Sequence, residues 1–327
     1  MVRPMLDDCW AAARDAHALI YDTMLVPAYH IAEKLDIPSM MTSTMPNMTR
    51  TAEFPLIGAP RLWDGRVGNR LSYELSRLSW WRGRGTLRSW CQSTLGTTPP
   101  RFPDYRYRHG KRVPVLHSYS PLVVPTPEDW PADTFASGYW FPESDSEWRP
   151  SPALDAFLAE GTPPVYLGFG SMSGLSGAGL VEDVITATRR VGCRAFVATG
   201  WGDAVLPRTD VFVVDEAPHE WLFPRVSAVV HHGGAGTTAA ALRFSRPSVV
   251  CPLVTDQFFW ARIVADRGWG PESVPQRTRS VASLTTALER AIGDTVMHEA
   301  VGRIGAAIRA EDGPTRAVDF VRAHLAS

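Results

Sequence analysis

The stretch SAVVHHGGAGTTAAALRFSRPSVVCPLVTDQFFWARIVADRGWG, residues 227–270, contains two strand–loop–helix units in succession. In the first unit, an apolar run ends at His231 and a glycine-rich turn leads into a helix near Gly236. In the second unit, another apolar run precedes a helix that opens at Asp256. Buried strands alternating with helices are typical of a doubly wound parallel sheet, and both loops then lie at the carboxyl edge, where ligands bind.

The residues of these two loops predict a binding site for a phosphorylated sugar. Glycines let the backbone approach a ligand closely, and the free N–H groups at a helix N-terminus favour an anion. His231 and His232 stand at the strand end, where they can add hydrogen-bond donors to a phosphate. Asp256 and Gln257 offer a carboxylate and an amide suited to sugar hydroxyls. The sequence therefore predicts a diphosphate site beside a sugar site.

The alternation of strands and helices runs through most of the chain. In the second half, apolar runs predict strands at 163–169, 193–199, 211–215, 227–231 and 246–252. Helices are predicted between them at about 178–191, 236–245 and 256–267. Residues 1–46 read as helix, strand, helix and strand. The acidic, proline-flanked segment 141–152 is the candidate linker, which predicts an α/β chain with domains 1–145 and 146–327.

The composition excludes several classes of protein. Of 327 residues, 45% are apolar and 20% charged, as in a packed globular chain, and a net charge of -1 argues against nucleic-acid binding. The four cysteines form no C-x-x-C pair and there is no D-x-D motif, so no metal is expected. No run of about 18 apolar residues occurs, and acids stand where a signal peptide would be apolar. We therefore expect a cytoplasmic protein.

One segment departs from this even balance of charge. Residues 61–112 carry twelve Lys/Arg and three Asp/Glu, a net of +9. A helix predicted over about 66–82 has apolar residues at steps of three and four, namely Val67, Leu71, Leu75, Leu78 and Trp81. Such a face either packs on the core or lies on an anionic membrane. A peripheral membrane contact is thus one of two interpretations of this helix.

Taken together, these motifs resemble the donor-binding signature of the GT-B nucleotide-sugar glycosyltransferases, the UDP-glycosyltransferase superfamily. The resemblance is strongest to the bacterial and fungal sterol- and antibiotic-type enzymes, which carry HHGGAGTT followed by a DQ pair. GFGSM at 168–172 and APHEWLFP at 217–224 extend the resemblance. It covers about 150–320 strongly and 1–60 less so. It implies two Rossmann-like, doubly wound domains, the first incomplete, with the last helix packing back on the first domain.

The resemblance also implies roles for individual residues. It implies donor-binding positions at Ser171, Pro218, His219, His231, His232, Gly234, Gly236, Thr237, Asp256 and Gln257. Among these, His231 would contact the donor phosphates, while His232 would share that role or only pack. The glycines and Thr237 would donate to the diphosphate, and Ser171 would reach the donor from the opposite loop. The Pro218-His219 backbone would grip the base, and Asp256 with Gln257 would hold the hexose hydroxyls.

Two positions differ from the family pattern. Plant relatives place a Trp before the equivalent Ala-Pro, where this chain has Glu216, so Trp201 and Trp221 are the candidates for stacking on the base. In the first domain, Asp22 falls on the position of an Asp that orients a catalytic His, yet the glycine loop and that His have no counterpart here. Three βα units, about 90 residues, would then precede this chain in the family pattern.

Other histidines could serve as the base instead. We expect His17 and His30 to be surface or core residues, whereas the sequence does not place His109 and His117.

The function that the resemblance implies is transfer of a hexose, with inversion, from UDP- or TDP-hexose to a hydroxyl of an apolar acceptor such as a sterol, terpenoid or polyketide. No cofactor or metal is implied. A catalytically silent sugar-nucleotide binder or auxiliary partner protein is the alternative. A sugar-nucleotide epimerase is disfavoured by the HHGGAGTT and DQ combination. Exposed strand edges in an incomplete first domain would favour a homodimer or a partner chain.

Overall fold

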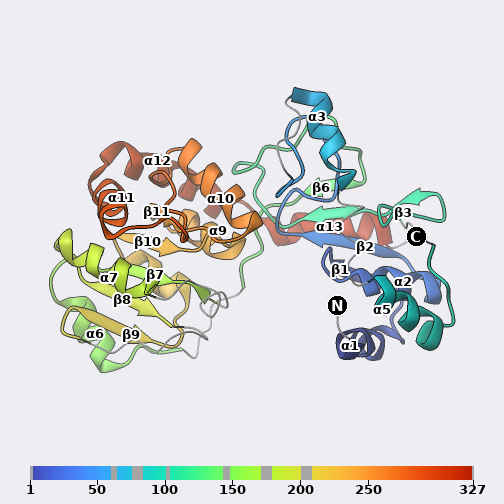
Figure 1. Ribbon diagram of the computed structural model, residues 1–327, viewed down its shortest axis with the longest axis horizontal. Helices are drawn as coiled ribbons and strands as arrows, with labels where there is room; N and C mark the ends of the chain where they lie inside the picture. Colours follow the sequence, from blue (N-terminus) through green and yellow to red (C-terminus); the bar gives the residue numbers. More distant parts are fainter. Residues whose placement is uncertain are drawn as a thin grey trace. The chain divides into compact units, whose positions relative to one another are not determined.

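The chain folds into two compact units, each with its own parallel sheet and core (Figure 1). The structure, a computed structural model, describes residues 3–59, 65–75, 84–100, 104–142, 148–170, 179–199 and 208–325. Unit 1 comprises Met1–Trp140 and Asp312–Ser327, and unit 2 comprises Phe141–Glu311. The chain therefore leaves unit 1 once and returns to it with its last helix.

Unit 2 contains a five-stranded parallel sheet in the order β11-β10-β7-β8-β9. Its strands are β7 Val165–Gly168, β8 Ala195–Ala198, β9 Val211–Val214, β10 Ala228–His231 and β11 Ser248–Val250. Each lies inside an apolar run from which a strand was predicted, so these predictions are confirmed. The register aligns Gly168 of β7 with His231 of β10 and Ala198 of β8, so the carboxyl ends of these three strands meet at one edge.

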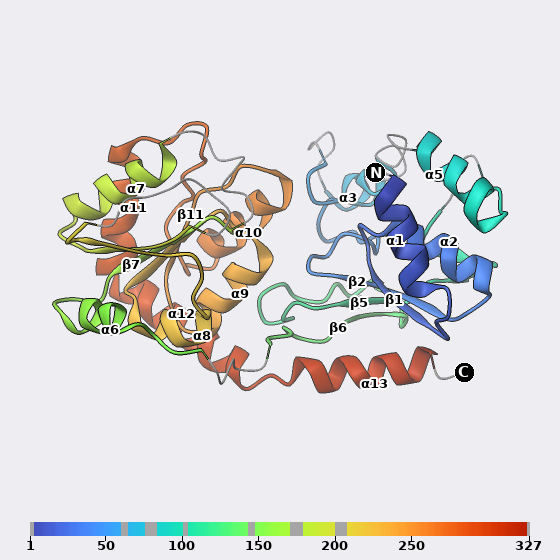
Figure 2. The same ribbon diagram turned by 90° about the horizontal axis from the view of Figure 1, so that it is seen from below.

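Helices cover both faces of this sheet (Figure 2). On one face lie α7 Leu180–Arg190 and α11 Val281–Gly293, whose buried residues form one core with the strands. A second core on the other face joins the strands to α6 Pro152–Ala159, α8 His219–Leu222 and α9 Ala235–Arg243. The remaining helices are the 3-10 turn η3 Phe223–Arg225, α10 Thr255–Asp266 and α12 Thr295–Arg309. The doubly wound arrangement is confirmed.

Unit 1 contains a four-stranded parallel sheet in the order β1-β2-β5-β6. Its strands are β1 Leu19–Asp22, β2 Ser39–Ser43, β5 Val115–His117 and β6 Thr134–Ala136. One face is covered by α1 Arg3–Ala13, α2 Val26–Leu35 and α5 Arg84–Trp90, which continues into the π-helical turn η1 Cys91–Leu95. A separate antiparallel pair is formed by β3 Tyr107–Arg108 and β4 Lys111–Arg112. The helix and strand order predicted for residues 1–46 is confirmed.

The last helix, α13 Gly313–Leu325, packs on the other face of the unit 1 sheet (Figure 2). Ala317 joins a cluster with Met40 of β2 and Leu116 of β5, and Phe320 stacks on Phe135 of β6. The start of α13 is tightly fitted, because a Cβ on Gly313 would overlap the Tyr139 carbonyl oxygen.

The helix predicted over 66–82 is shorter than expected: α3 Gly65–Ser72 ends at Ser72, where residues 73–74 form a turn. Within α3, Val67 and Leu71 are exposed rather than packed on the core. Of the other apolar positions in that predicted helix, Leu78 and Trp81 lie outside the described residues.

Candidate functional site

The loop between β10 and α9 ends in an exposed helix N-terminus. Gly234 is the N-cap of α9 and has no side chain to bond to the first free N–H groups of the helix. Thr238 stabilises this turn, because its Oγ1 donates a hydrogen bond to the Gly234 carbonyl oxygen at 2.9 Å. Gly236 is exposed, and a Cβ at this position would have no atom within 4 Å. The first turn of α9 therefore faces open space with its N–H groups available to an anion.

His231 is buried at the end of β10 and is bonded to the turn that follows it. His231 ends β10 between β7 and β11, and its side chain has no exposed surface. Its Nδ1 accepts the Gly233 N–H at 3.0 Å, which leaves the proton of the neutral ring on Nε2. Burial lowers the pKa of His231 to about 3. The buried, neutral ring therefore supports the turn through its Nδ1.

His232 is the histidine that faces the α9 N-terminus. A Cβ on Gly234 would come within 2.5 Å of His232 Nε2, and a Cβ on Gly170 would lie 3.7 Å from His232 Cε1. The ring thus stands between the loop after β7 and the first turn of α9. Burial lowers the pKa of His232, and the charge of Asp256 partly opposes that shift. Because the ring is only partly buried, it can meet a ligand bound at this helix end.

Gly233 brings the two loops of the signature together. Its φ of +93° is in the region that favours glycine, and a Cβ would come 2.8 Å from Val250 Cγ1 and 2.9 Å from the Gln257 carbonyl oxygen. The glycine-rich turn therefore packs directly on the end of β11 and the start of α10. This contact places the glycine-rich turn beside the pair Asp256-Gln257.

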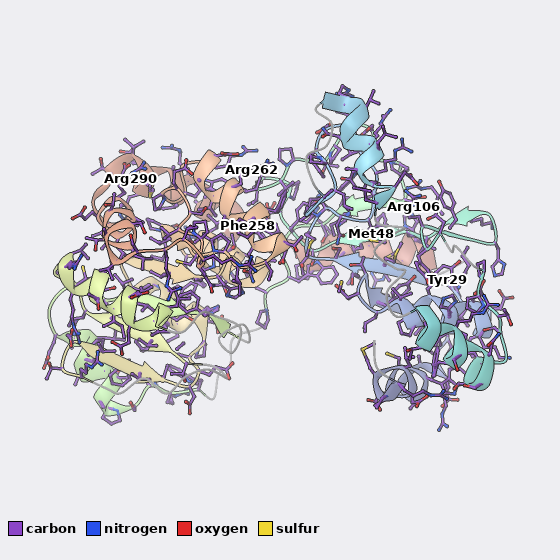
Figure 3. All side chains as sticks on the ribbon, viewed as in Figure 1. Tyr29, Met48, Arg106, Phe258, Arg262 and Arg290 are labelled. Carbon is purple, nitrogen blue, oxygen red and sulfur yellow. The ribbon has the colours of Figure 1, made fainter. Side chains whose placement is uncertain are left out.

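Asp256 and Gln257 have different local environments at the start of α10. The Gln257 side chain is buried, and its Oε1 accepts the N–H groups of Leu253 at 2.8 Å and Val254 at 3.1 Å. Its amide oxygen thus holds the loop, and its Nε2 is the group with donors to offer a ligand. Asp256 is partly exposed in the first turn of α10. Val254 and Phe258, the latter labelled in Figure 3, expose apolar side chains close to Asp256 in the sequence.

The segment Pro218-His219 opens α8, with Pro218 as N-cap. The His219 ring stacks on Phe223 at 4.3 Å, and its Nε2 lies 3.4 Å from the Tyr166 hydroxyl. Burial lowers the pKa of His219, so this ring is held neutral. Tyr166 was missed by the sequence reasoning. Tyr166 and Gly168 are two residues apart on β7, so they lie on the same face of the strand. The Tyr166 hydroxyl fills the space that a Cβ on Gly168 would take, and this Tyr-x-Gly pattern could have indicated the contact.

Of the residues predicted to stack on the base or to reach the donor from the opposite loop, only Trp221 lies in the described part of the chain. Trp221 packs against Trp148 at 4.8 Å, and the Arg225 guanidinium lies 4.3 Å from its ring centre. The structure thus gives Trp221 a packing role within unit 2. Glu216 is exposed after β9. The predictions for Ser171 and Trp201 fall on residues outside the described part of the chain.

In unit 1, Asp22 is the last residue of β1 and lies at the carboxyl edge of its sheet. Its Oδ1 accepts the Met24 N–H at 2.8 Å, which fixes the carboxylate in a local turn. In the part of the chain that the structure describes, no hydrogen bond joins Asp22 to a histidine.

The four other candidate histidines are now placed. His17 is exposed, and His109 is exposed in the turn between β3 and β4. His30 is buried on α2, with Nδ1 3.4 Å from Glu33 Oε2. His117, at the end of β5, is buried and stacked on Trp130 at 4.8 Å, and burial lowers its pKa to about 3. The expectation of surface or core positions for His17 and His30 is confirmed.

The known proteins that this chain resembles are glycosyltransferases. Residues 202–323 match the family model described as erythromycin biosynthesis protein CIII-like, C-terminal domain. A sterol 3-beta-glucosyltransferase of Neosartorya fischeri is 33% identical over 97% of this chain and 23% of its own length. Another of Arabidopsis thaliana is 35% identical over 92% of this chain and 48% of its own length. These matches support a member of the UDP-glycosyltransferase superfamily. The chain spans about a quarter of the fungal relatives and about half of the plant relatives.

Solved structures agree on the GT-B fold. The glycosyltransferase of kitacinnamycin matches with a TM-score of 0.71 and 18% identity, over 98% of this chain and 79% of that one. The glycosyltransferase VinC, solved in complex with dTDP, matches with a TM-score of 0.63 and 20% identity, over 99% of this chain and 76% of that one. At these identities the likeness establishes the fold, which confirms the fold class predicted from the sequence.

Two other features are absent from the described residues. No cluster of three or more His, Cys, Asp or Glu side chains there could hold a metal ion. Among the same residues, no helix is both long and apolar enough to cross a bilayer.

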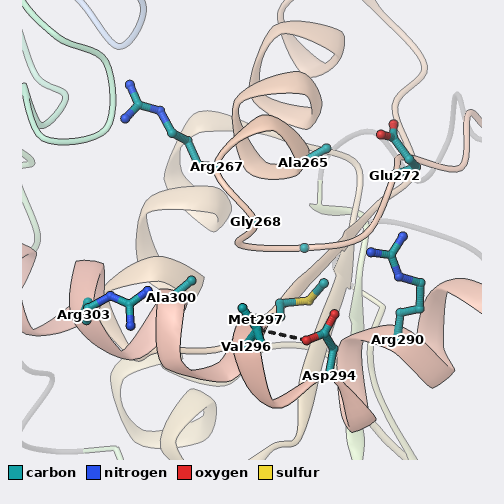
Figure 4. A pocket seen from close by; sticks show the side chains of 11 residues that line it. Ala265, Arg267, Gly268, Glu272, Arg290, Asp294, Val296, Met297, Ala300 and Arg303 are labelled. Atoms are coloured by element: carbon teal, nitrogen blue, oxygen red, sulfur yellow. Dashed lines mark hydrogen bonds between the residues drawn. The ribbon is translucent and has the colours of Figure 1, made fainter.

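A pocket of about 310 Å³ lies at the opposite end of α10 from Asp256 (Figure 4). Its lining mixes arginines with acids and includes Arg267, Arg290, Arg303, Glu272 and Asp294. Asp294 accepts the Met297 N–H at 3.1 Å as the N-cap of α12. This pocket shares no residue with the predicted donor-binding set.

Proposed function

We propose that this chain binds a nucleoside-diphosphate hexose through unit 2 and takes part in transfer of the hexose to a hydroxyl of an apolar acceptor. The observation that carries the proposal is the meeting of His232, the first turn of α9 and Asp256 at one sheet edge. The names of the relatives support an apolar acceptor of the sterol type, and VinC in complex with dTDP supports a pyrimidine donor. UDP-hexose and TDP-hexose are both candidate donors.

The chemistry proposed is direct displacement at the anomeric carbon with inversion. The acceptor oxygen forms the new bond on one face of the sugar while the bond to the diphosphate oxygen breaks on the other. Negative charge develops on the departing diphosphate, and the N–H groups of the α9 first turn oppose it. His232 adds a donor to the same oxygens, and Thr237 lies in that first turn. The reaction as proposed uses no cofactor beyond the sugar nucleotide itself.

The hexose hydroxyls would be held at the start of α10. The Asp256 carboxylate would accept hydrogen bonds from the sugar hydroxyls, and the Gln257 Nε2 would donate to a hydroxyl oxygen while its Oε1 keeps the loop in place. The Pro218-His219 segment would meet the base. On the acceptor side, Asp22 would orient a base that takes the hydroxyl proton.

The second candidate function is sugar-nucleotide binding without transfer, alone or as an auxiliary partner of another enzyme. It is favoured by one observation: among the described residues, no hydrogen bond joins Asp22 to a histidine. The two candidates share the donor site and differ only in the presence of a base.

Calorimetry with UDP, dTDP and UDP-glucose, followed by a transfer assay with a labelled donor and a sterol, tests both candidates. We expect saturable binding of at least one nucleotide. A folded chain that binds none of them overturns the donor-site assignment. Binding with no transfer to any sterol or polyketide acceptor selects the silent binder over the transferase.

A further inference from the structure

His232 lies with one edge of its imidazole ring against the N-terminus of α9. A Cβ on Gly234 would come 2.5 Å from His232 Nε2 and 3.2 Å from its Cε1, and a Cβ on Gly170 would lie 3.7 Å from the same Cε1. The Nε2–Cε1 edge therefore faces the N-cap of α9 and the loop after β7. Nε2 is thus the ring nitrogen nearest to the helix end at which the diphosphate is proposed to bind.

The two neighbouring histidines differ in what a second ring proton would cost. His231 Nδ1 accepts the Gly233 N–H at 3.0 Å, so a proton on this nitrogen would break that hydrogen bond. His232 Nδ1 is buried and has no hydrogen-bond partner among the described residues. In that part of the chain, a proton on His232 Nδ1 therefore breaks no hydrogen bond, and His232 is the histidine of the pair that is free to become charged.

The groups around His232 keep its ring neutral in the free chain. Burial lowers the pKa of His232 and outweighs the charge of Asp256, at the start of α10, which raises it. The positive end of the α9 dipole also disfavours a charged ring. His231 on β10 and His219 on α8 are held neutral by burial. The first turn of α9 and residues 168–178, which include the loop after β7, contain no titratable side chain.

A bound diphosphate reverses this balance of charge. Its negative oxygens would lie between His232 Nε2 and the N–H groups of α9, where they offset the helix dipole and add to the effect of Asp256. We propose that His232 binds the donor diphosphate as an imidazolium and takes up one proton from solvent when the sugar nucleotide binds. This role rests on the proposed function, because it concerns the same donor site. The charged ring then opposes the negative charge that develops on the departing diphosphate.

Calorimetry of the full chain in two buffers of different ionisation enthalpy, PIPES and Tris, measures the protons taken up on binding. The probe is UDP-glucose or dTDP-glucose, whichever binds more tightly, since free UDP carries a terminal phosphate whose second pKa is about 6 and would titrate as well. We expect proton uptake at pH 7, seen as a binding heat that differs between the buffers. Affinity should rise roughly three- to ten-fold from pH 8 to pH 6, because one linked proton changes affinity by at most about ten-fold per pH unit.

His232→Gln is the decisive variant, because its amide keeps a hydrogen-bond donor and does not titrate near neutral pH. It should remove the difference between the buffers and make the affinity nearly constant from pH 6 to pH 8. The control is His298→Gln, at a partly buried histidine on α12 outside the donor-binding set, which should leave both results unchanged. Urea unfolding checks that each variant folds, and His232→Asn takes the place of His232→Gln if the latter does not.

Two results overturn the charged state of His232 while the donor site stands. One is sugar-nucleotide binding by the parent chain with equal heats in the two buffers and an affinity that does not change with pH. The other is proton uptake that persists in His232→Gln, which assigns the linked proton to another group. A folded parent chain that binds neither sugar nucleotide overturns the proposed function, and the role of His232 with it.

Discussion

The His232 ring lies directly over Gly234, so that a Cβ on residue 234 would come within 2.5 Å of His232 Nε2. The His232 ring and the N-cap of α9 are thus in direct contact, and a side chain at residue 234 would displace the ring. His231, its neighbour in sequence, is fully buried and bonded to the Gly233 N–H.

The contact between His232 and Gly234 gives a first prediction. His232→Ala should weaken UDP or dTDP binding by about 1–3 kcal/mol, the scale of a lost charge-assisted hydrogen bond, with little change in stability. Calorimetry measures the affinity, and urea unfolding measures the stability. His231→Ala is the comparison, since removal of a buried side chain should lower stability first. If the His232 variant binds nucleotide with unchanged affinity, His232 does not contact the bound diphosphate.

Asp256 and Gln257 should respond differently to substitution. Asp256→Asn should weaken UDP-hexose binding and leave UDP binding nearly unchanged, because the carboxylate would meet hydroxyls and not phosphate. Gln257→Ala should lower the free energy of unfolding by about 1–3 kcal/mol, since the Leu253 and Val254 N–H groups lose their acceptor. Gln257→Glu keeps that acceptor and should restore stability. Equal losses of UDP and UDP-hexose affinity in Asp256→Asn would argue against a sugar contact.

The two buried histidines predict a fall in stability on acidification. Burial lowers the pKa of His117 and His231 to about 3, whereas an unfolded histidine titrates near 6.5. Between these values the unfolded chain binds more protons, so the free energy of unfolding falls as pH drops from about 6.5 toward 3. The loss should be on the order of 2 kcal/mol per histidine at about pH 5. His117→Phe, which keeps a ring against Trp130, should make urea unfolding measurably less pH-dependent; an unchanged slope would contradict burial of a neutral His117.

Asp22 should matter for transfer and not for donor binding. Asp22→Asn retains the Oδ1 that accepts the Met24 N–H, so the turn after β1 should survive. If Asp22 orients the acceptor-side base, transfer should fall roughly 10²-fold or more, because general-base catalysis typically contributes 10²–10⁴-fold. UDP affinity, set in unit 2, should stay the same. Asp22→Asn with full transfer activity would assign Asp22 a purely local structural role.

The sequence alone predicted the five strands of unit 2 and the first two strands of unit 1, whereas β5 and β6 of unit 1 were not predicted. It also predicted where along the chain the donor site would lie. Apolar runs such as 227–231 and 246–252 are local signals, and a parallel sheet brings the loops after such strands to one edge whatever the other residues are. The HHGGAGTT and DQ motifs could be recognised from the sequence because they too are local signals. Turn glycines and residues at the start of a helix act through the backbone next to them.

Only the tertiary structure decided which side chain meets open space. Adjacent residues on a strand point to opposite faces, so the sequence could not tell whether His231 or His232 faces α9; the packing of β10 between β7 and β11 settled it. The outward face of α3 is fixed by hydrogen bonds to the segment 52–56, which is 16–17 residues away in the sequence. The return of α13 to unit 1, which the resemblance had implied, likewise depends on contacts with the distant strands β2 and β5. Such contacts depend on the neighbours that folding brings together, which no local pattern of residues contains.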